Sequence, residues 1–116
     1  MTPPPVVDGH GAAAVTAQFE ALVRVYPDGT PRTKHVTTNV VVDLAPDAGS
    51  ATSRCYFTVF QQTDELPLQP IIAGRYHDRF VRVDGTWRFA DRLIFSDLIG
   101  DLRHHLLVDV FGGAGA

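Results

Sequence analysis

The sequence of 116 residues contains one cysteine, Cys55, so an intramolecular disulfide is impossible. This thiol lies in the apolar run RCYFTVF, which favours a buried, reduced side chain and a cytoplasmic protein. No apolar run approaches the roughly 20 residues that cross a bilayer as a helix. The ten Lys and Arg residues are scattered and the net charge is −3, whereas nucleic-acid binding needs clustered basic residues. We therefore expect no membrane segment and no nucleic-acid partner.

Composition and length indicate one globular domain. With 45% hydrophobic and 20% charged residues, the chain has enough apolar side chains for a core, and its length suits a single domain over residues 1–116. The opening MTPPPVVDGHG lacks the basic segment followed by an apolar one that marks a secretory signal. Residues 1–9 are therefore predicted to be a flexible leader, and the glycine-rich residues 112–116 a flexible tail.

Apolar residues recur at helical spacing between His10 and Tyr26. The stripe consists of Val15, Phe19, Leu22, Val23 and Tyr26. Asp8 is a candidate N-cap, although the neighbouring glycines weaken the first turn. The segment YPDGTP ends the helix, because a proline disfavours helical geometry in the residue before it.

The period then changes to two, which predicts a strand over residues 34–44, KHVTTNVVVDL. One face carries His35, Thr37 and Asn39, and the opposite face carries mostly valines. Either the polar face meets solvent at the end of a strand, or it lines the wetter part of a pocket. In the second case we expect His35 to be at least half buried.

Two further β-rich segments follow, over residues 51–62 and 71–97. The second contains the dipeptide Asp84-Gly85, which is typical of a hairpin turn. Residues 98–111 resemble a short terminal helix. A helix followed by long antiparallel strands with one half-polar face predicts an α+β fold in which a curved sheet surrounds a pocket.

Three segments together resemble the SnoaL-like branch of the nuclear transport factor 2-like superfamily. They are AGRYHDRFVRVDGTWRFADR, TKHVTTNVVVDL and LIGDLRHHL, and the resemblance spans residues 12–107. It implies a cone-shaped half-barrel, a curved antiparallel sheet with a helix packed across it. Members include dehydratases, ketosteroid isomerases, polyketide cyclases, a dehydrochlorinase and epoxide hydrolases, besides noncatalytic binding modules, so the fold alone does not choose the chemistry.

The resemblance implies a cofactor-free lyase or isomerase acting on a small hydrophobic, cyclic substrate. His35 matches the family's general base, and its free pKa of about 6.5 suits proton transfer near neutrality. Arg92 matches an arginine that stabilises negative charge in the dehydrochlorinase pocket. The residues expected to bind substrate are Tyr56, Tyr76, Asp78, Ile94 and Asn39, with Phe57 or Phe60 beside them.

One departure from the family weakens the catalytic interpretation. Relatives begin with further helices that carry an aspartate partner for the histidine, and no residue here matches that aspartate. The histidine–aspartate dyad would lack its aspartate, as in an N-terminally truncated member, and activity of this chain alone should be weak or absent. The alternative is a noncatalytic ligand-binding or dimerisation module. In either case we expect a homodimer or higher oligomer, because an uncovered concave face exposes apolar side chains.

The role of Arg92 depends on the register of the hairpin. A three-residue loop places Tyr76 opposite Arg92, whereas a two-residue turn places His77 there. The family analogy favours the first, in which Tyr76 and Arg92 share a face and His77 points away.

Simpler interpretations remain for the charged residues. Asp78 could form a salt bridge with a neighbouring arginine instead of serving the pocket. The adjacent His104 and His105 would point about 100° apart on a helix and make a poor metal pair. The sequence suggests no metal site.

Overall fold

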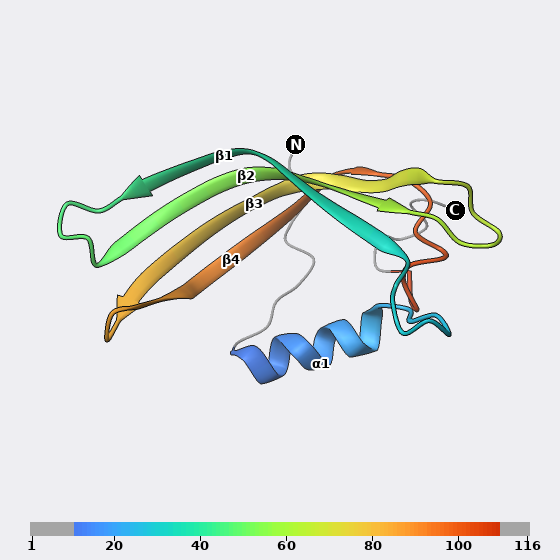
Figure 1. Ribbon diagram of the computed structural model, residues 1–116, viewed down its shortest axis with the longest axis horizontal. Coiled ribbons are helices and arrows are strands. Elements are labelled where there is room, and N and C mark those ends of the chain that lie inside the picture. The colour runs from blue at the N-terminus through green and yellow to red at the C-terminus, as the bar shows by residue number, and fades with distance from the viewer. Residues whose placement is uncertain (1–10, 110–116) are drawn as a thin grey trace.

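The computed structural model describes residues 11–109 and has one helix and four strands (Figure 1). The elements are α1 (Ala12–Leu22), β1 (Thr33–Leu44), β2 (Ser50–Gln61), β3 (Gln69–Val83) and β4 (Thr86–Ile99). The strands form one sheet in the order β1-β2-β3-β4, and every neighbouring pair is antiparallel. The α+β class predicted from the sequence is confirmed.

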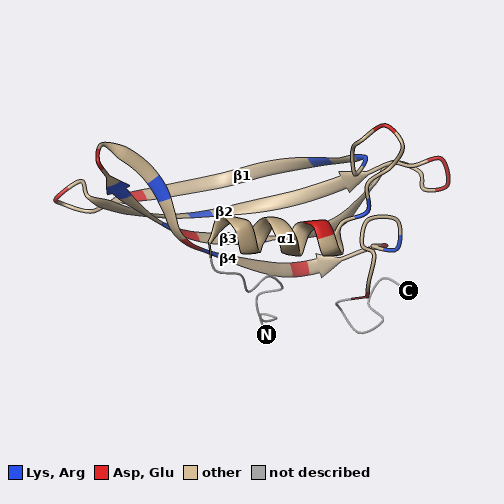
Figure 2. Ribbon diagram, turned by 90° about the horizontal axis from the view of Figure 1, so that it is seen from below, with Lys and Arg blue, Asp and Glu red and all other residues tan. Residues whose placement is uncertain are grey.

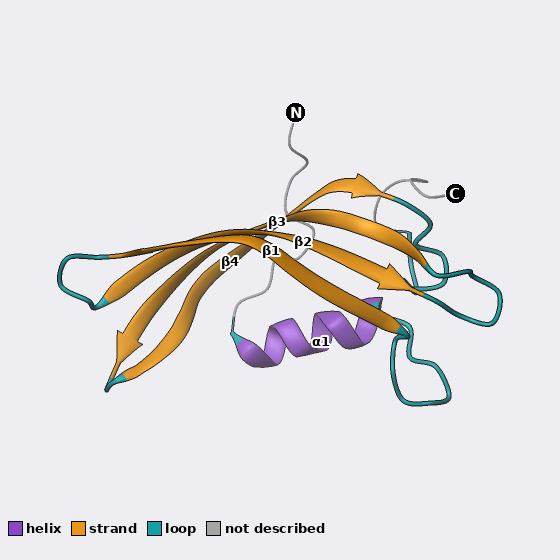
Figure 3. Ribbon diagram, turned by 45° about the horizontal axis from the view of Figure 1, so that its top comes forward, coloured by secondary structure: helices purple, strands orange, loops and turns teal. Residues whose placement is uncertain are grey.

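The sheet bends along its long strands but is not curled into a barrel, so the expected cone is only partly formed. Helix α1 lies on the concave side of the sheet (Figures 1 and 3). None of its residues is buried, which contradicts the expectation of a helix packed across the sheet. The residues that the structure describes therefore leave most of the concave face without a covering element.

Helix α1 is shorter than the predicted span from His10 to Tyr26. Val23 has extended backbone angles and forms an isolated antiparallel bridge with Leu106. The bridge draws the chain out of the helix one residue after Leu22, because β pairing needs an extended conformation. The predicted N-cap, Asp8, lies outside the described residues.

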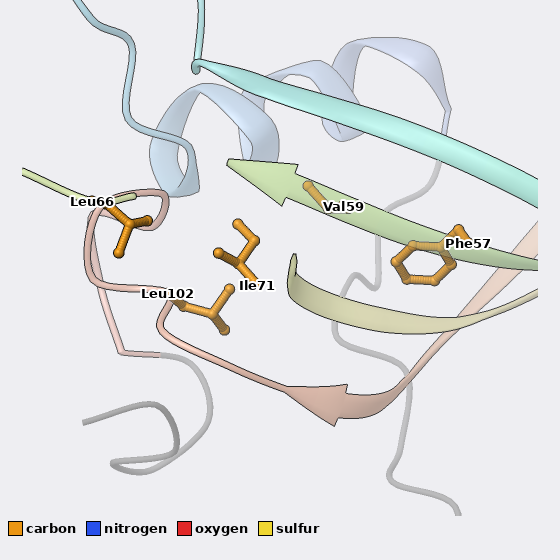
Figure 4. Packing of buried hydrophobic residues seen from close by; sticks show 5 residues of the cluster. All are labelled: Phe57, Val59, Leu66, Ile71 and Leu102. Atoms are coloured by element: carbon orange, nitrogen blue, oxygen red, sulfur yellow. The ribbon is translucent and has the colours of Figure 1, made fainter. Parts of the chain in front are cut away.

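The apolar core lies at one end of the sheet, beside the C-terminal end of α1. It consists of Phe57, Val59, Leu66, Ile71 and Leu102 (Figure 4). These side chains come from β2, β3, the loop between them and the segment after β4. That segment and the loop fold back over the concave face and enclose this end of it.

The predicted terminal helix over residues 98–111 does not form in its described part. Strand β4 continues to Ile99, and turns follow. The Gly100 amide donates to the Ile71 carbonyl at 2.7 Å, which ties the segment to β3 in place of a helical bond. The predicted leader and tail lie outside the described residues.

A bulge in β1 overturns the simple alternation predicted for residues 34–44. Thr38 pairs with Tyr56 and Val41 with Arg54, so two residues of β1 oppose Cys55 alone. The bulge includes Asn39, whose φ of 56° is left-handed; asparagine tolerates this region better than most residues. Beyond the bulge, each side chain lies on the face opposite to the one expected.

The β3–β4 hairpin combines a tight turn with a second bulge. Val83 pairs with Thr86, and Asp84 and Gly85 both have positive φ, 52° and 77°, as a type I′ turn requires. The three-residue loop that the family analogy favoured is therefore wrong. Between Phe80 and Arg79 the register shifts by one, so Arg92 lies opposite Asp78, not opposite either residue that we expected.

Candidate functional site

The concave face is identified by the burial of β2. Phe57 and Val59 belong to the core on this side, so every second residue of β2 faces the concavity. Through the register, Tyr76 lies beside Cys55, Asp78 beside Ser53, and Ile94 beside Tyr76. As predicted, Cys55 is a buried free thiol.

Arg92 and Asp78 form a two-bonded ion pair on this face. The Arg92 Nε donates to one carboxylate oxygen at 2.7 Å, and a terminal nitrogen donates to the other at 3.1 Å. The Asp78 side chain is 3% exposed and that of Arg92 is 39% exposed. Its hydrogen bonds to Asp78 raise the pKa of Arg92 above its usual value. Asp78 is thus the salt-bridge partner of the simpler interpretation.

Two aromatic rings lie against the same guanidinium group. Its central carbon lies 4.0 Å from the centre of the Tyr76 ring and 4.8 Å from that of Phe89. Tyr76 in turn stacks on Phe57, with 4.5 Å between ring centres. We call Phe57, Tyr76, Arg92, Phe89 and Asp78 the ring platform. The prediction that Tyr76 and Arg92 share a face, and that His77 does not, is confirmed, although its assumed register was wrong.

The ring platform offers flat aromatic surface and one polar group that can bind a ligand, the Tyr76 hydroxyl. Burial raises the pKa of the Tyr76 hydroxyl, which the nearby Arg92 partly offsets. The hydroxyl therefore stays protonated at neutral pH and can donate a hydrogen bond. The charge of Arg92 is compensated by Asp78 and lies over two aromatic rings, so the platform does not need an anionic ligand.

A SnoaL-like domain family matches residues 5–93. The chain belongs to the SnoaL-like domain family. Among solved structures, it is similar to Rv3472, a protein of unknown function from Mycobacterium tuberculosis, with 29% identity and a TM-score of 0.51. The similarity covers 59% of this chain and 38% of that protein, so the chain spans well under half of its length. No curated protein matches the chain.

Two of the residues expected to bind substrate lie away from the platform of this SnoaL-like domain. Tyr56 alternates with Cys55 and Phe57 on β2, so it faces the convex side. Asn39 and Tyr56 line a shallow depression there, of about 420 Å³, together with Arg75 and His77. The bulge in β1 and the alternation of side chains along β2 therefore place Asn39 and Tyr56 on the face opposite to Tyr76, Asp78 and Ile94. Phe60 faces the same side as Tyr56, so of the two alternatives Phe57 and Phe60, only Phe57 belongs to the ring platform.

The expected base, His35, lies on the concave face but at its other end. It pairs with Val59, whereas the row of Asp78 and Arg92 crosses β2 at Ser53. Those β2 positions are six residues apart, about 20 Å along a strand. His35 is exposed, so the expected burial in a concavity does not occur within the described residues. Its neighbour is a histidine and not the predicted Tyr76 or Arg92.

That neighbour is His105, which sequence reasoning did not select. Burial, and then the charge of His35, lower the pKa of His105, and its buried Nδ1 has no hydrogen-bond partner among the described residues. The sequence placed His105 on a helix, where it would point away from His104. The turn after β4 instead brings it near His35, and only the tertiary fold reveals that proximity.

Residues 11–109 show neither a metal-binding cluster nor a membrane-spanning helix. This part of the chain contains no group of three or more histidine, cysteine or acidic residues that could hold a metal ion. No helix among the described residues is long and apolar enough to cross a membrane.

Proposed function

We propose that this SnoaL-like domain binds a small hydrophobic, ring-containing ligand on its concave face, and that binding rather than turnover is its main activity. The observation that carries the proposal is the ring platform, in which Arg92 is bonded twice to Asp78 and lies over the rings of Tyr76 and Phe89.

Apolar side chains surround the platform towards the tips of the hairpins. Val42 and Leu44 of β1 lie on the same face, and Trp87 extends the row of Phe89 on β4. All three are exposed, as is Phe89. Ligand sites combine such apolar walls with a few placed polar groups, and the Tyr76 hydroxyl supplies one. A flat, cyclic molecule suits stacked rings better than a flexible chain does.

The same geometry weighs against the lyase and isomerase chemistry that the resemblance suggested. An anion developing on a substrate needs an uncompensated donor, and Arg92 already serves Asp78. A base and an anion-stabilising group must also reach the same small substrate, whereas His35 and Arg92 are separated by about 20 Å along the strands.

Proton transfer is the second candidate function, and the proximity of two histidines favours it. His105 keeps a lowered pKa beside His35, so a neutral imidazole is present near neutral pH, as a general base must be. In this alternative His35 and His105 would act at the closed end of the concave face, on a cofactor-free reaction, without Arg92.

Self-association is part of the proposal. Exposed apolar residues lie on both faces of the sheet, for example Leu44 on the concave face and Val36 on the convex one. Monomeric proteins rarely expose large apolar patches, so a homodimer or higher oligomer is expected at tens of micromolar; sedimentation showing a monomer there would contradict it. The buried, unpaired Cys55 is consistent with the proposed cytoplasmic location.

The binding proposal is tested with 2-naphthol, a planar two-ring phenol, followed by amide shifts in a ¹H–¹⁵N NMR titration. We expect shifts in β3 and β4 around Tyr76 and Arg92. Tyr76→Leu, which keeps apolar volume but removes the ring, should weaken binding about fivefold, in line with a stacking pair of roughly 1 kcal/mol.

The matched control is Arg79→Gln, since Arg79 forms an exposed pair with Asp91 on the opposite face. It should leave the affinity unchanged. Absence of platform shifts, or equal binding by Tyr76→Leu, would contradict the proposal. Loss of binding in His35→Gln, with Tyr76→Leu unaffected, would favour the histidine end of the face instead.

A further inference from the structure

A second cleft lies outside the concave face, at the end of the molecule where α1 meets the core. We call it the base cleft. It encloses about 640 Å³, within the range of small-molecule sites, and is formed by the chain after α1, the β2–β3 loop and the turn after β4. Its lining includes Arg24, Tyr26, Arg32, Asp64, Glu65 and Arg103. None of these residues belongs to the ring platform.

The walls of the base cleft are fastened to one another. The Tyr26 hydroxyl donates to the His104 carbonyl, and the Arg24 amide donates to the His105 carbonyl at 2.8 Å. Behind the cleft, the Gln61 side chain is 1% exposed. Its amide nitrogen donates to the carbonyls of Pro31 and His104 at 3.1 and 3.0 Å. Buried hydrogen bonds of this kind hold the walls in place before any ligand arrives.

Most charges in the base cleft are already paired. Arg103 donates to both carboxylate oxygens of Asp101 at 2.9 and 2.7 Å, and those bonds lower the pKa of Asp101 to about 2. Arg32 lies 3.6 Å from Asp28. These pairs supply a polar rim and need no further counter-charge.

Two charges in the same cleft have no partner among the described residues. Arg24 is partly buried and forms no ion pair, and Asp64 on the facing loop forms none. Glu65, beside Asp64, has only His104 at 3.7 Å. Figure 2 shows basic and acidic segments in the loops at this end of the molecule.

We propose that the base cleft binds a small amphoteric molecule, such as an amino acid or a short peptide with free ends. Its carboxylate pairs with Arg24, and its ammonium group pairs with Asp64 and Glu65. A partly buried cation that lacks a counter-charge is unfavourable, and an arginine matches a carboxylate in two parallel bonds. A simple anion or cation would satisfy only one wall, whereas a molecule with both charges spans the cleft.

The test is a ¹H–¹⁵N NMR titration of the whole chain with L-alanyl-L-alanine. We expect shifts at residues 24–32, 63–65 and 103–104, with a dissociation constant of about a millimolar for so small a ligand. Arg24→Gln and Asp64→Asn should each weaken binding at least tenfold. Arg88→Gln, which removes an exposed arginine on the distant hairpin, should not. N-acetyl-dialanine and dialanine amide, which each lack one charge, should also bind at least tenfold more weakly.

Three results would overturn the inference: no shifts in the cleft at about 20 mM, well above the expected constant; equal binding of a capped peptide; or unchanged affinity in Arg24→Gln. Because none of these variants touches the ring platform, 2-naphthol binding should persist in all of them. Failure here is therefore distinguishable from failure of the proposed function.

Discussion

The two ends of the concave face use the same strands for different purposes. At the closed end, Val59 and Ile71 are enclosed by Leu66 and Leu102 from the segments that fold back over the sheet. At the open end, Leu44 and Phe89 occupy equivalent inward-facing positions but are 59% and 58% exposed. Residues of the same chemical type are core in one place and surface in the other.

The difference shows that the face of a strand does not determine burial by itself. Strand alternation selects which residues point inward, but only a covering segment removes them from water. Here the β2–β3 loop and the chain after β4 cover one end alone. Stability should therefore be concentrated at the closed end, and ligand contact should be available at the open end.

The most direct way to break this comparison is to truncate one apolar residue at each end. Ile71 is 0% exposed, so Ile71→Ala should lower the free energy of unfolding by about 2–5 kcal/mol. Leu44→Ala at the open end should cost less than about 0.5 kcal/mol. Urea denaturation followed by far-UV circular dichroism measures both. Equal losses would mean that the open end is covered in solution, as a dimer could achieve.

Two glycines sharpen the same comparison. A Cβ added at Gly74 would lie 1.8 Å from the Phe95 carbonyl oxygen and 2.9 Å from the Phe57 ring. Because backbone must move, Gly74→Ala should cost about 3 kcal/mol or more. At the open tip, a Cβ on Gly85 meets nothing within 4 Å, and only its φ of 77° resists substitution. Gly85→Ala should therefore cost about 1 kcal/mol; thermal unfolding of both variants would reveal a reversed order.

Much of this fold could be predicted from the sequence, because local residue patterns indicate the strands and the hairpin. The period-two pattern predicted β1, and the Asp84-Gly85 dipeptide predicted the hairpin, although the family analogy favoured the wrong loop length. Family resemblance supplied the SnoaL-like assignment. The helix was placed correctly in kind but extended too far, since the bridge from Val23 to Leu106 is a contact between distant segments.

The candidate site could be predicted only in part, and the bulges explain why. An extra residue at Asn39 or after Phe89 leaves no clear mark in the sequence, yet it moves the side chains beyond it to the opposite face. The grouping of Tyr76, Asp78 and Arg92 was expected, and so was a salt bridge of Asp78 as the simpler alternative, but not the register that places Asp78 opposite Arg92. The proximity of His35 to His105 depends on the segment after β4, whose path no local pattern indicates.

Two Arg–Asp pairs on one hairpin test whether burial governs their value. Asp78→Asn removes the charge that compensates Arg92, and we expect a loss of about 1–2 kcal/mol, reduced from the buried limit because Arg92 is partly exposed. Asp91→Asn breaks the exposed pair with Arg79, 60% and 49% exposed, and should cost under about 0.5 kcal/mol. Equal costs in urea denaturation would show that the ring platform adds no stability.

The smallest expected effect is a dependence on pH at the closed end. Burial, together with His35, lowers the pKa of His105 below the unfolded value of about 6.5. The folded chain therefore holds this proton less tightly than the unfolded chain does. The contribution of His105 to stability is fully present above about pH 6.5 and is lost as the pH falls through the lowered folded pKa. The free energy of unfolding should decrease over that window.

His105→Gln should flatten this decrease, because glutamine does not titrate. His35→Gln should shift the window upward without removing it, since burial, the larger cause of the lowered pKa, remains while the second charge is gone. His77→Gln is the matched control: it lies on the opposite face, against Phe95, and should leave the decrease as it is in the unaltered chain. Urea denaturation at closely spaced pH values measures all three. If the decrease survives His105→Gln unchanged, another group causes it, and His35 and His105 do not meet as the fold places them.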